Sequence, residues 1–482
     1  MSNSVNKNAA YNTIKTVFGI IYPLITFPYI SRVLMPENVG KINFGSSVVS
    51  YFMLIASLGV TTYAIRECSK VRDNKDELER TANQLISINL LSTFIAYLAL
   101  VVTLFVARPL DNYRELICIQ SATIIFTTLG ADWINSAMED FKFIAMRTVG
   151  MQIVSLVLMF VFVHNPEDYI IFAIISVVAS SGANVINIIY RRKFCRTKFT
   201  FQIDWKKHLP PILTLFSLIL AQTIYCNSDM TMLGLMKGDY EVGLYSTSVK
   251  IYNLVNQVVA SVAFVVMPQL AVSFAKDDFK RVNELLRYAL NFIVILGLPC
   301  LVEMNVICTS IIGTLGGNEY LGATTSLHIL SLSLACSFIG GWIGNMMMLP
   351  SGRDAVCLRS GVISAVLNVV LNIFLIPIYG LNGAAFTTFL AELTGIIVKW
   401  PYIDKRIKIE KLFKMVKAPV VGSIFIAIIG LFVPKIINSY VLISGVTISI
   451  SAIVYALTLI IMKDEFFMGY MRPLMDRVRR NN

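Results

Sequence analysis

One stretch without any charged side chain is Tyr440-Val-Leu-Ile-Ser-Gly-Val-Thr-Ile-Ser-Ile450-Ser-Ala-Ile-Val-Tyr-Ala-Leu-Thr-Leu-Ile-Ile-Met462. An α-helix needs about 20 predominantly apolar residues to cross the hydrocarbon core of a bilayer, so this stretch is long enough for one crossing. Similar runs recur throughout the 482 residues, of which 56% are hydrophobic and only 15% charged. Soluble domains carry about 25% charged residues. We therefore expect a membrane protein.

The apolar runs predict an all-α polytopic membrane protein with about fourteen transmembrane helices. Most connections between the runs are short. The predicted spans are 11–34, 42–65, 82–107, 115–137, 148–163, 169–190, 209–236, 243–274, 287–313, 322–349, 360–379, 383–403, 416–434 and 440–462.

The distribution of basic residues predicts the orientation in the membrane, because lysine and arginine are enriched in cytoplasmic connections. If the N-terminus is cytoplasmic, most of the 41 lysine and arginine residues fall in inside segments. One missed or additional helix would invert the pattern downstream of it, so an even number of helices with both termini inside is favoured. The basic residues then left on the outside are Arg32, Lys41, Arg108, Arg114, Lys237 and Lys435.

The basic stretch from Arg191 to His208 follows six predicted helices and indicates a linker between two lobes. Pro36-Glu-Asn-Val-Gly40 resembles Asp239-Tyr-Glu-Val-Gly243. Such an echo is typical of transporters built from parallel repeats, although chance similarity in apolar sequence is the alternative. We predict an N-terminal six-helix lobe at 1–190, a cytoplasmic linker at 191–208, a C-terminal six-helix lobe at 209–403, and two further helices with a basic cytoplasmic tail at 404–482.

Ionisable side chains within predicted spans are candidates for function, because a charge in the membrane is costly and normally faces a cavity or a partner. Asp229 and Lys250 fall at similar depth in consecutive predicted helices. They form either a buried pair that neutralises itself or a site in which Asp229 positions Lys250 for an anionic ligand. Glu303 and Glu392 are either hydrogen-bonded packing residues or part of a proton or cation path.

Lys15 and Arg32 lie near opposite ends of the first predicted helix, where they either extend to the interface or contribute to a cationic cavity. Asp132 falls in the inner third of the fourth predicted helix. The candidate substrate-binding residues are Lys250, Arg32, Lys15 and Arg66, and the candidate coupling or structural charge partners are Asp229, Asp132, Glu303 and Glu392.

Several function classes are disfavoured by the sequence. Three histidines and eight scattered cysteines without a C-x-x-C pair give no metal site. No phosphate-binding glycine loop, nucleophile elbow or zinc-protease motif occurs. The outer connections are too short to hold the catalytic loop expected of a membrane polymerase or ligase. The net charge of +12 follows the cytoplasmic connections, so we expect neither an enzyme nor a nucleic-acid partner.

Several motifs resemble those of Wzx-type polysaccharide flippases. They are Pro28-Tyr-Ile-Ser-Arg-Val-Leu-Met-Pro-Glu-Asn-Val-Gly40, Leu58-Gly-Val-x-x-Tyr-Ala-Ile-Arg66-Glu, Asp132-Trp, Glu139-x-Phe-Lys142, Asn227-Ser-Asp229-x-x-Met-Leu-Gly234, Tyr245-x-x-x-x-Lys250-Ile and Met267-Pro268. One departure is Met35, where the family usually has glycine. This departure concerns the turn between the first two helices.

The resemblance implies the superfamily of multidrug, oligosaccharidyl-lipid and polysaccharide transporters, whose two six-helix lobes form a V, often with two extra helices. It implies alternating access, in which a cationic cavity carries undecaprenyl-pyrophosphate-linked oligosaccharide from the cytoplasmic to the outer leaflet of the bacterial inner membrane. Coupling to protons or sodium is implied for some members. Expected partners are membrane lipids and the lipid-linked oligosaccharide, and a polysaccharide polymerase and glycosyltransferases are further candidates. The alternative function is a multidrug or metabolite/cation antiporter of the same superfamily.

Overall fold

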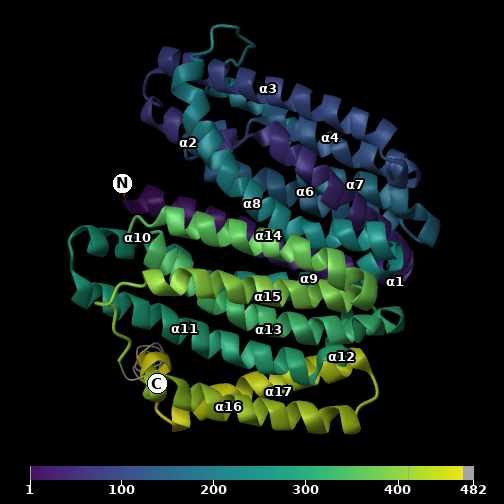
Figure 1. Ribbon diagram of the computed structural model, residues 1–482, viewed down its shortest axis with the longest axis vertical. Coiled ribbons are helices and arrows are strands. Elements are labelled where there is room, and N and C mark those ends of the chain that lie inside the picture. Colours follow the sequence, from purple (N-terminus) through teal and green to yellow (C-terminus); the bar gives the residue numbers. More distant parts are fainter. Residues whose placement is uncertain (1, 411, 470–482) are drawn as a thin grey trace. The chain divides into compact units, whose positions relative to one another are not determined.

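The computed structural model describes residues 2–410 and 412–469, which form helices and connections without a β-strand (Figure 1). The all-α prediction is therefore confirmed. By its internal contacts the chain divides into two compact units, Met1–Gly243 and Leu244–Asn482. Each unit is described by itself. The predicted lobes and linker stay a prediction, and the basic stretch from Arg472 to Arg480 lies outside the described residues.

The first unit is built on the long helix α1, against which several later helices pack. In chain order its helices are α1 (Ser2–Ser57), α2 (Val60–Lys70), α3 (Lys75–Val106), η1 (Arg108–Tyr113), α4 (Arg114–Gly130), α5 (Trp133–Ala137), α6 (Phe141–Phe162), η2 (Pro166–Asp168), α7 (Tyr169–Tyr190), η3 (Arg191–Lys193), α8 (Trp205–Lys237) and the start of α9 (Asp239–Ala260).

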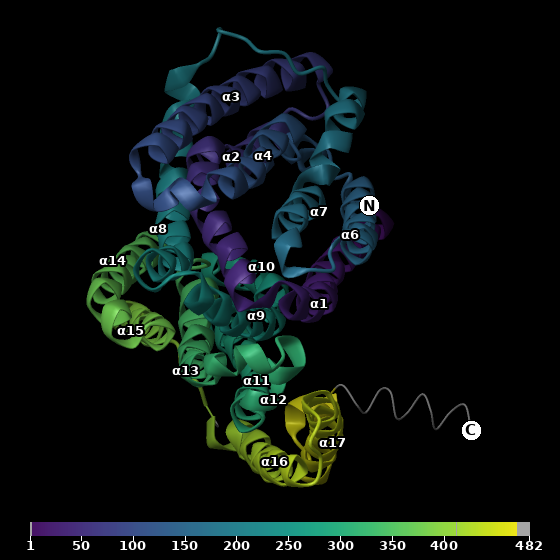
Figure 2. The same cartoon turned by 90° about the vertical axis from the view of Figure 1, so that its right-hand side faces the viewer.

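Helix α1 is kinked at Met35, whose φ of 62° and ψ of 167° are not helical. Pro36 follows the kink, and proline removes a backbone hydrogen bond from a helix. On the two sides of this point α1 contacts α3, α4, α6 and α8, and α4 and α6 both pack on α7. Figure 2 shows α3, α4, α6 and α7 around the path of α1. The kink therefore lets one continuous segment contribute to two parts of the bundle.

The second unit combines a three-helix group with a group built around α11. After α9 its helices are α10 (Val262–Ala275), α11 (Phe279–Val306), α12 (Cys308–Leu315), η4 (Asn318–Ala323), α13 (Thr324–Gly341), the π-helix η5 (Trp342–Met348), α14 (Asp354–Tyr379), α15 (Leu381–Lys399), η6 (Trp400–Tyr402), α16 (Leu412–Phe432), η7 (Val433–Lys435) and α17 (Tyr440–Ile461).

Helix α15 packs against both α13 and α14, whereas α16 packs between α11 and α17. Figures 1 and 2 both show α16 and α17 side by side. Buried Ile295, Ala418, Ile426 and Tyr455 connect α11, α16 and α17, and the Tyr455 hydroxyl donates a hydrogen bond of 2.8 Å to the Ile295 carbonyl. The last two helices are thus attached to the second unit through α11.

Large apolar side chains cover much of the outer surface of each unit. On α3, Phe94 and Phe105 are 69% and 76% exposed, and on α14 Ile378 is 68% exposed. Eleven helices of the described residues are long and apolar enough to cross a bilayer, and the pair Asp239–Ala260 and Val265–Ala275, bent by 49°, adds a twelfth if it forms one span. The protein is a multi-pass membrane protein. The number fourteen stays a prediction.

The predicted connection before the fifth span is wrong. Helix α6 begins at Phe141, and Arg147 lies inside it instead of in a loop. Asp140 caps this helix, because its side chain accepts a hydrogen bond of 3.4 Å from the amide of Phe143. The apolar pattern predicts the start of this span at residue 148, because polar residues occur in the first two turns of α6. A helix with an N-cap residue tolerates such residues.

Candidate functional site

A charged pair lies where the fourth apolar run breaks in the first unit. Helix α4 ends at Gly130, Ala131 adopts a left-handed conformation with φ of 45°, and Asp132 then precedes the short helix α5. The carboxylate of Asp132 forms an ion pair with the guanidinium of Arg147 on α6. Asp132 is thus at a helix break, and not in the interior of a continuous helix as its predicted position implied.

Arg147 is almost completely enclosed, with 2% of its side chain exposed, compared with 37% for Asp132. It donates a second hydrogen bond of 2.8 Å to the Ala183 carbonyl of α7, and its guanidinium lies 5.6 Å from the centre of the Phe143 ring. A buried cation needs such partners, because removing one member of a buried pair costs about 3–5 kcal/mol. The pair therefore joins the break after α4 to α6 and α7.

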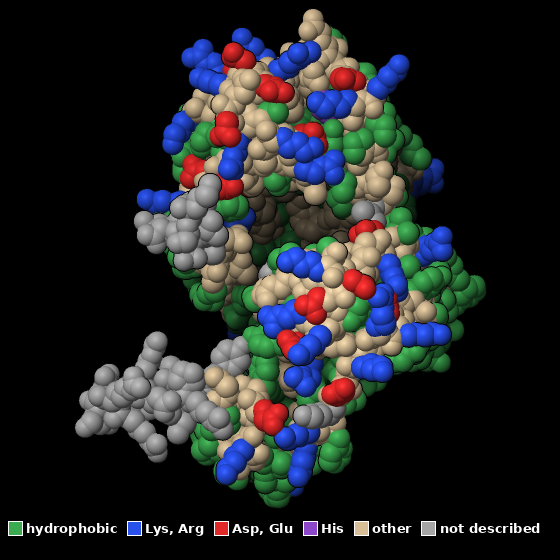
Figure 3. Space-filling model, turned by 90° about the vertical axis from the view of Figure 1, so that its left-hand side faces the viewer, with side chains coloured by type: hydrophobic (Ala, Val, Ile, Leu, Met, Phe, Trp, Pro, Cys, Tyr) green, Lys and Arg blue, Asp and Glu red, His purple; other side chains and the backbone are tan. Residues whose placement is uncertain are grey.

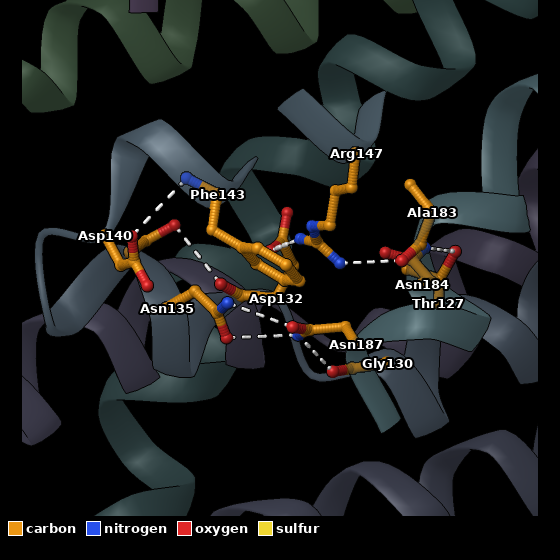
Figure 4. A network of polar contacts seen from close by, with 11 residues as sticks. Thr127, Gly130, Asp132, Asn135, Asp140, Phe143, Arg147, Ala183, Asn184 and Asn187 are labelled. Atoms are coloured by element: carbon orange, nitrogen blue, oxygen red, sulfur yellow. Dashed lines mark hydrogen bonds and ion pairs between the residues drawn. The ribbon is translucent and has the colours of Figure 1, made fainter. Parts of the chain in front are cut away.

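Two asparagines complete this network, which Figure 4 shows from close by. The amides of Asn135 and Asn187 exchange hydrogen bonds of 2.9 and 3.1 Å, and Asn187 also donates to the Gly130 carbonyl at 2.8 Å. Both asparagines are fully buried. The carbonyl that α4 leaves unpaired at its end is therefore satisfied by a side chain of α7.

A second charged group lies inside the second unit, around Gly340 at the end of α13. Lys399 of α15 donates a hydrogen bond of 3.0 Å to the Gly340 carbonyl. Glu392, two turns earlier on α15, accepts one of 3.4 Å from the Tyr252 hydroxyl. A Cβ atom added at Gly340 would lie 3.6 Å from the Lys399 ammonium and 3.8 Å from a Glu392 oxygen, so both charges flank this glycine.

The π-helix η5 begins two residues after Gly340. Single turns of π-helix occur frequently at functional sites. The Lys399 ammonium also lies against Gly344 within η5, at 3.5 Å from an added Cβ atom. The glycines of the segment Gly340-Gly-Trp-Ile-Gly344 therefore make room for a charged side chain.

The two segments that echo each other in sequence are in direct contact in the first unit. A Cβ atom added to Gly40 would collide with the backbone carbonyl of Asp239, and one added to Gly243 would collide with the carbonyl of Pro36. The Tyr113 hydroxyl donates a 2.7 Å hydrogen bond to the Asp239 carboxylate beside this crossing. The contact is reciprocal, because each glycine meets the backbone of the other segment.

The cationic candidates of the first unit lie on α1 and α2. Lys15 is half-buried, whereas Arg32 and Arg66 are exposed. Arg32 donates a hydrogen bond of 2.7 Å to the Pro28 carbonyl of its own helix. Arg66 forms an ion pair of 3.3 Å with Glu67. The structure does not bring these three cations together into one cluster within the interactions that it describes.

The remaining candidates are distributed over both units. Asp229 lies in α8 of the first unit and is 5% exposed, and Lys250 lies half-buried in α9 of the second. Their predicted pairing therefore stays a prediction. Glu303 lies in α11, with its carboxyl group next to Ser451 of α17.

The site predicted from the sequence does not include Arg147 or Lys399. A signal for Lys399 exists in the sequence, because it follows Glu392 by seven residues and so lies on the same face of a helix. Arg147 is fifteen residues after Asp132 on another helix. Only the tertiary structure relates these two residues.

A family model described as polysaccharide biosynthesis protein matches residues 5–274. The chain belongs to this family. One relative, the putative O-antigen transporter of Escherichia coli, is 20% identical over 400 residues, which cover 81% of this chain and 94% of the relative. The capsular polysaccharide biosynthesis protein CapF of Staphylococcus aureus is 22% identical over 410 residues, covering 83% of this chain and 99% of CapF.

The fold of this chain is similar to solved structures of two kinds of transporter. The lipid II flippase MurJ in an inward closed conformation matches with a TM-score of 0.75 and 17% identity, over 96% of this chain and 99% of MurJ. An inward-facing multidrug resistance transporter of the MATE family matches with a TM-score of 0.59 and 13% identity, over 80% of this chain and 94% of that transporter. These similarities confirm the predicted fold, and the family match over residues 5–274 confirms the predicted family resemblance.

Proposed function

We propose that this protein is a flippase that moves lipid-linked oligosaccharide repeat units across the membrane for surface polysaccharide biosynthesis. The observation that carries the proposal is membership of the polysaccharide biosynthesis protein family over residues 5–274. Relatives named as O-antigen transporters, and a lipid II flippase with the same fold, support this cargo class. The protein acts as a transporter and not as an enzyme.

The cargo head is a polyprenyl pyrophosphate of the undecaprenyl type. Coulomb attraction between a pyrophosphate and fixed cations is poorly screened in a low-dielectric cavity, so buried or half-buried cations are suited to hold it. Lys250 and Lys15, which are half-buried, meet this condition, and Lys250 is the first to test because it lies in the middle of α9. The exposed Arg32 and Arg66 are the further proposed binding residues, because arginine can bind a phosphate through paired hydrogen bonds. Asp229, Asp132, Glu303 and Glu392 are the proposed partners for charge balance or for coupling to H+ or Na+.

Transport proceeds by alternating access. The reciprocal contact of Gly40 with Asp239 and of Gly243 with Pro36 supports this mechanism, because it closes two related turns upon each other at the predicted outer side. Only glycine allows backbones to approach so closely. Separation of these turns would open the outer side without any change of fold within the helices.

Fourteen crossings are consistent with the helices described. Tyr11–Lys70 contains 60 residues with a kink at Met35, which is about 90 Å of helix and enough for two crossings of a core about 30 Å thick. One further crossing by α4 with α5, and one by the bent pair α9 and α10, would bring the total to fourteen. An even count puts both termini on the same side of the membrane, and the distribution of basic residues favours the cytoplasmic side in a bacterium. The proposed lobes are 1–190 and 209–403. A polymerase or glycosyltransferases are the proposed partners.

The proposal is tested by deleting the gene and following lipid-linked repeat units in each leaflet. We expect these lipids to accumulate in the cytoplasmic leaflet and surface glycan to be lost. Restoration should be poor with Lys250→Ala, better with Lys250→Arg, and complete with Lys237→Ala, an exposed lysine at the end of α8. Normal surface glycan in the deletion strain would contradict the proposal.

A drug or metabolite/cation antiporter is the second candidate, because the MATE transporters share the fold. Dye efflux by the purified protein in vesicles, combined with an unchanged surface glycan in the deletion strain, would favour this candidate. Absence of dye efflux by the purified protein, together with loss of surface glycan in the deletion strain, would support the flippase.

A further inference from the structure

A pocket of about 790 Å³ lies in the second unit at one membrane end of α10, α11, α16 and α17. This volume is within the range of about 300–1,000 Å³ that is typical of small-ligand sites. None of the candidate residues discussed above lines this pocket. Its basic lining residues are Arg281, Arg287, Lys414, Lys417 and Lys463, and its acidic ones are Glu284, Asp464 and Glu465.

Each acidic group of the pocket is already occupied by a partner. Glu284 forms an ion pair of 3.1 Å with Arg281, and Glu465 forms one of 2.5 Å with Lys414. Asp464 is 7% exposed and accepts hydrogen bonds of 3.1 and 3.0 Å from the backbone amides of two phenylalanines that follow it. The five basic side chains that line the pocket outnumber these three acidic ones, so its described lining carries a net positive charge.

Three cations of the pocket therefore lack an acidic partner among the described residues, namely Arg287, Lys417 and Lys463. Lys417 and Lys463 are exposed, and Arg287 is half-buried. Arginine offers paired donors to a phosphate and lysine a point charge. The net positive charge of this hollow is suited to an anionic phosphate group.

Apolar side chains also line the pocket. Val265 and Val266 of α10, Leu285 of α11, and Met415 and Met462 near the ends of α16 and α17 line it. Val265 is 62% exposed. A ligand in this pocket would therefore contact both cations and apolar side chains, which is the chemistry of a lipid headgroup and its first acyl carbons.

The depth of the pocket in the membrane agrees with this chemistry. Arg281 and Arg287 lie near the start of the span Phe279–Val306, Lys417 lies near the start of Leu412–Lys435, and Lys463 follows the end of Tyr440–Ile461. All these ends lie on the side that the charge distribution assigns to the cytoplasm. Figure 3 shows lysine and arginine side chains gathered on the face of the second unit that contains these helix ends.

We propose that this pocket binds the headgroup of an anionic glycerophospholipid from the cytoplasmic leaflet, such as phosphatidylglycerol. Arg287, Lys417 and Lys463 contact the phosphate, and the acyl chains lie along α10 and Met462. Basic pockets between transmembrane helices at the cytoplasmic side are known to take such headgroups. The bound lipid fastens α16 and α17 to α11, whichever molecule the protein transports.

The test uses the full-length protein in detergent and measures its binding of short-chain phosphatidylglycerol. Lys417→Gln/Lys463→Gln changes two exposed side chains, so the variant is expected to fold. Lys276→Gln/Lys280→Gln is the matched control, because these exposed lysines lie at the same end of α10 and α11 but do not line the pocket. We expect the pocket variant to lose roughly tenfold in affinity, the control to keep the wild-type affinity, and short-chain phosphatidylcholine to bind neither.

Three results would overturn the proposal. Equal loss in both variants means that general surface charge attracts the lipid. Unchanged binding in the pocket variant means that the lipid binds elsewhere. A short-chain prenyl pyrophosphate that binds at these residues and is not displaced by phosphatidylglycerol identifies the site as one for the transported lipid.

Discussion

Gly40 and Gly243 each press against the backbone of the segment that contains the other. The carbonyl of Asp239 occupies the space where a Gly40 side chain would lie, and the carbonyl of Pro36 occupies the corresponding space at Gly243. Both contacts involve backbone atoms, which have little freedom to move aside. The packing of these two turns therefore depends on the absence of two methyl groups.

Replacing either residue by alanine should separate the two turns. We expect Gly40→Ala and Gly243→Ala each to reduce transport of lipid-linked oligosaccharide in reconstituted vesicles by roughly tenfold or more, because the proposed closure at the predicted outer side depends on this backbone contact. Gly19→Ala and Gly150→Ala are matched controls, since an added Cβ atom meets nothing within 4 Å at either position. Transport at the wild-type rate in the Gly40 and Gly243 variants would show that the contact is dispensable.

The pair Asp132 and Arg147 should be sensitive to the loss of one partner. Asp132→Ala leaves the enclosed guanidinium of Arg147 without its counter-charge, and we expect a loss of about 3 kcal/mol in the free energy of unfolding in detergent. This value is at the lower end for buried pairs because Asp132 is 37% exposed. The double variant Asp132→Ala/Arg147→Leu should recover part of the loss.

The ion pair between Arg72 and Glu139 provides the control for this experiment. Its side chains are 39% and 51% exposed, so Arg72→Gln should cost less than about 1 kcal/mol. If Asp132→Ala is no more costly than Arg72→Gln, then the network of Figure 4 is not a structural element of the first unit.

Met35 has a backbone conformation that disfavours any residue except glycine, with φ of 62° and ψ of 167°. Met35→Gly should therefore stabilise the protein by about 1 kcal/mol, since relief of about 1–3 kcal/mol of strain exceeds the entropic cost of glycine. Met146→Gly, at an exposed position within α6, should instead destabilise by about 1 kcal/mol. Thermal unfolding in one detergent compares the two, and destabilisation by Met35→Gly would contradict the assigned strain.

The sequence was sufficient to predict the architecture but only part of the site. Apolar runs locate the spans because burial in lipid imposes length and composition on each one. Arg147 was missed because its cost in the membrane is offset by Asp132 and the Ala183 carbonyl, which come from other helices. The echo of Gly40 and Gly243 was visible in the sequence, yet their mutual contact follows only from how α1 and α9 cross.

Asp404 should make the connection before α16 sensitive to acid. Hydrogen bonds and the charge of Arg406 lower the pKa of Asp404 to about 2. Since an unfolded aspartate has a pKa of about 3.9, the stabilisation is complete above this value and is lost as pH falls through about 2. Amide hydrogen exchange of the connection should increase over this window in the wild-type protein.

Asp404→Asn removes the same interactions at neutral pH, including the ion pair of 3.6 Å with Arg353. We expect faster exchange around residues 402–408 at pH 7 and no further increase between pH 4 and pH 2. Glu410→Gln, an exposed position in the same connection, is the control and should behave like the wild type. Equal acid sensitivity in the Asp404 variant would assign the effect to another group.

Lys399 and Glu392 should act together in transport, because both charges flank Gly340 beside the π-helix. Lys399→Ala leaves the Gly340 carbonyl without its donor and Glu392 without the nearby cation, and we expect transport to decrease roughly tenfold at normal protein level. Glu392→Gln/Lys399→Ala should restore part of the activity, since the negative charge that Lys399 helps to balance is then removed. Lys405→Ala changes an exposed lysine shortly after α15 and should leave transport unchanged. If the double variant is no more active than Lys399→Ala alone, the two charges are independent and the effect arises from the lost hydrogen bond to Gly340.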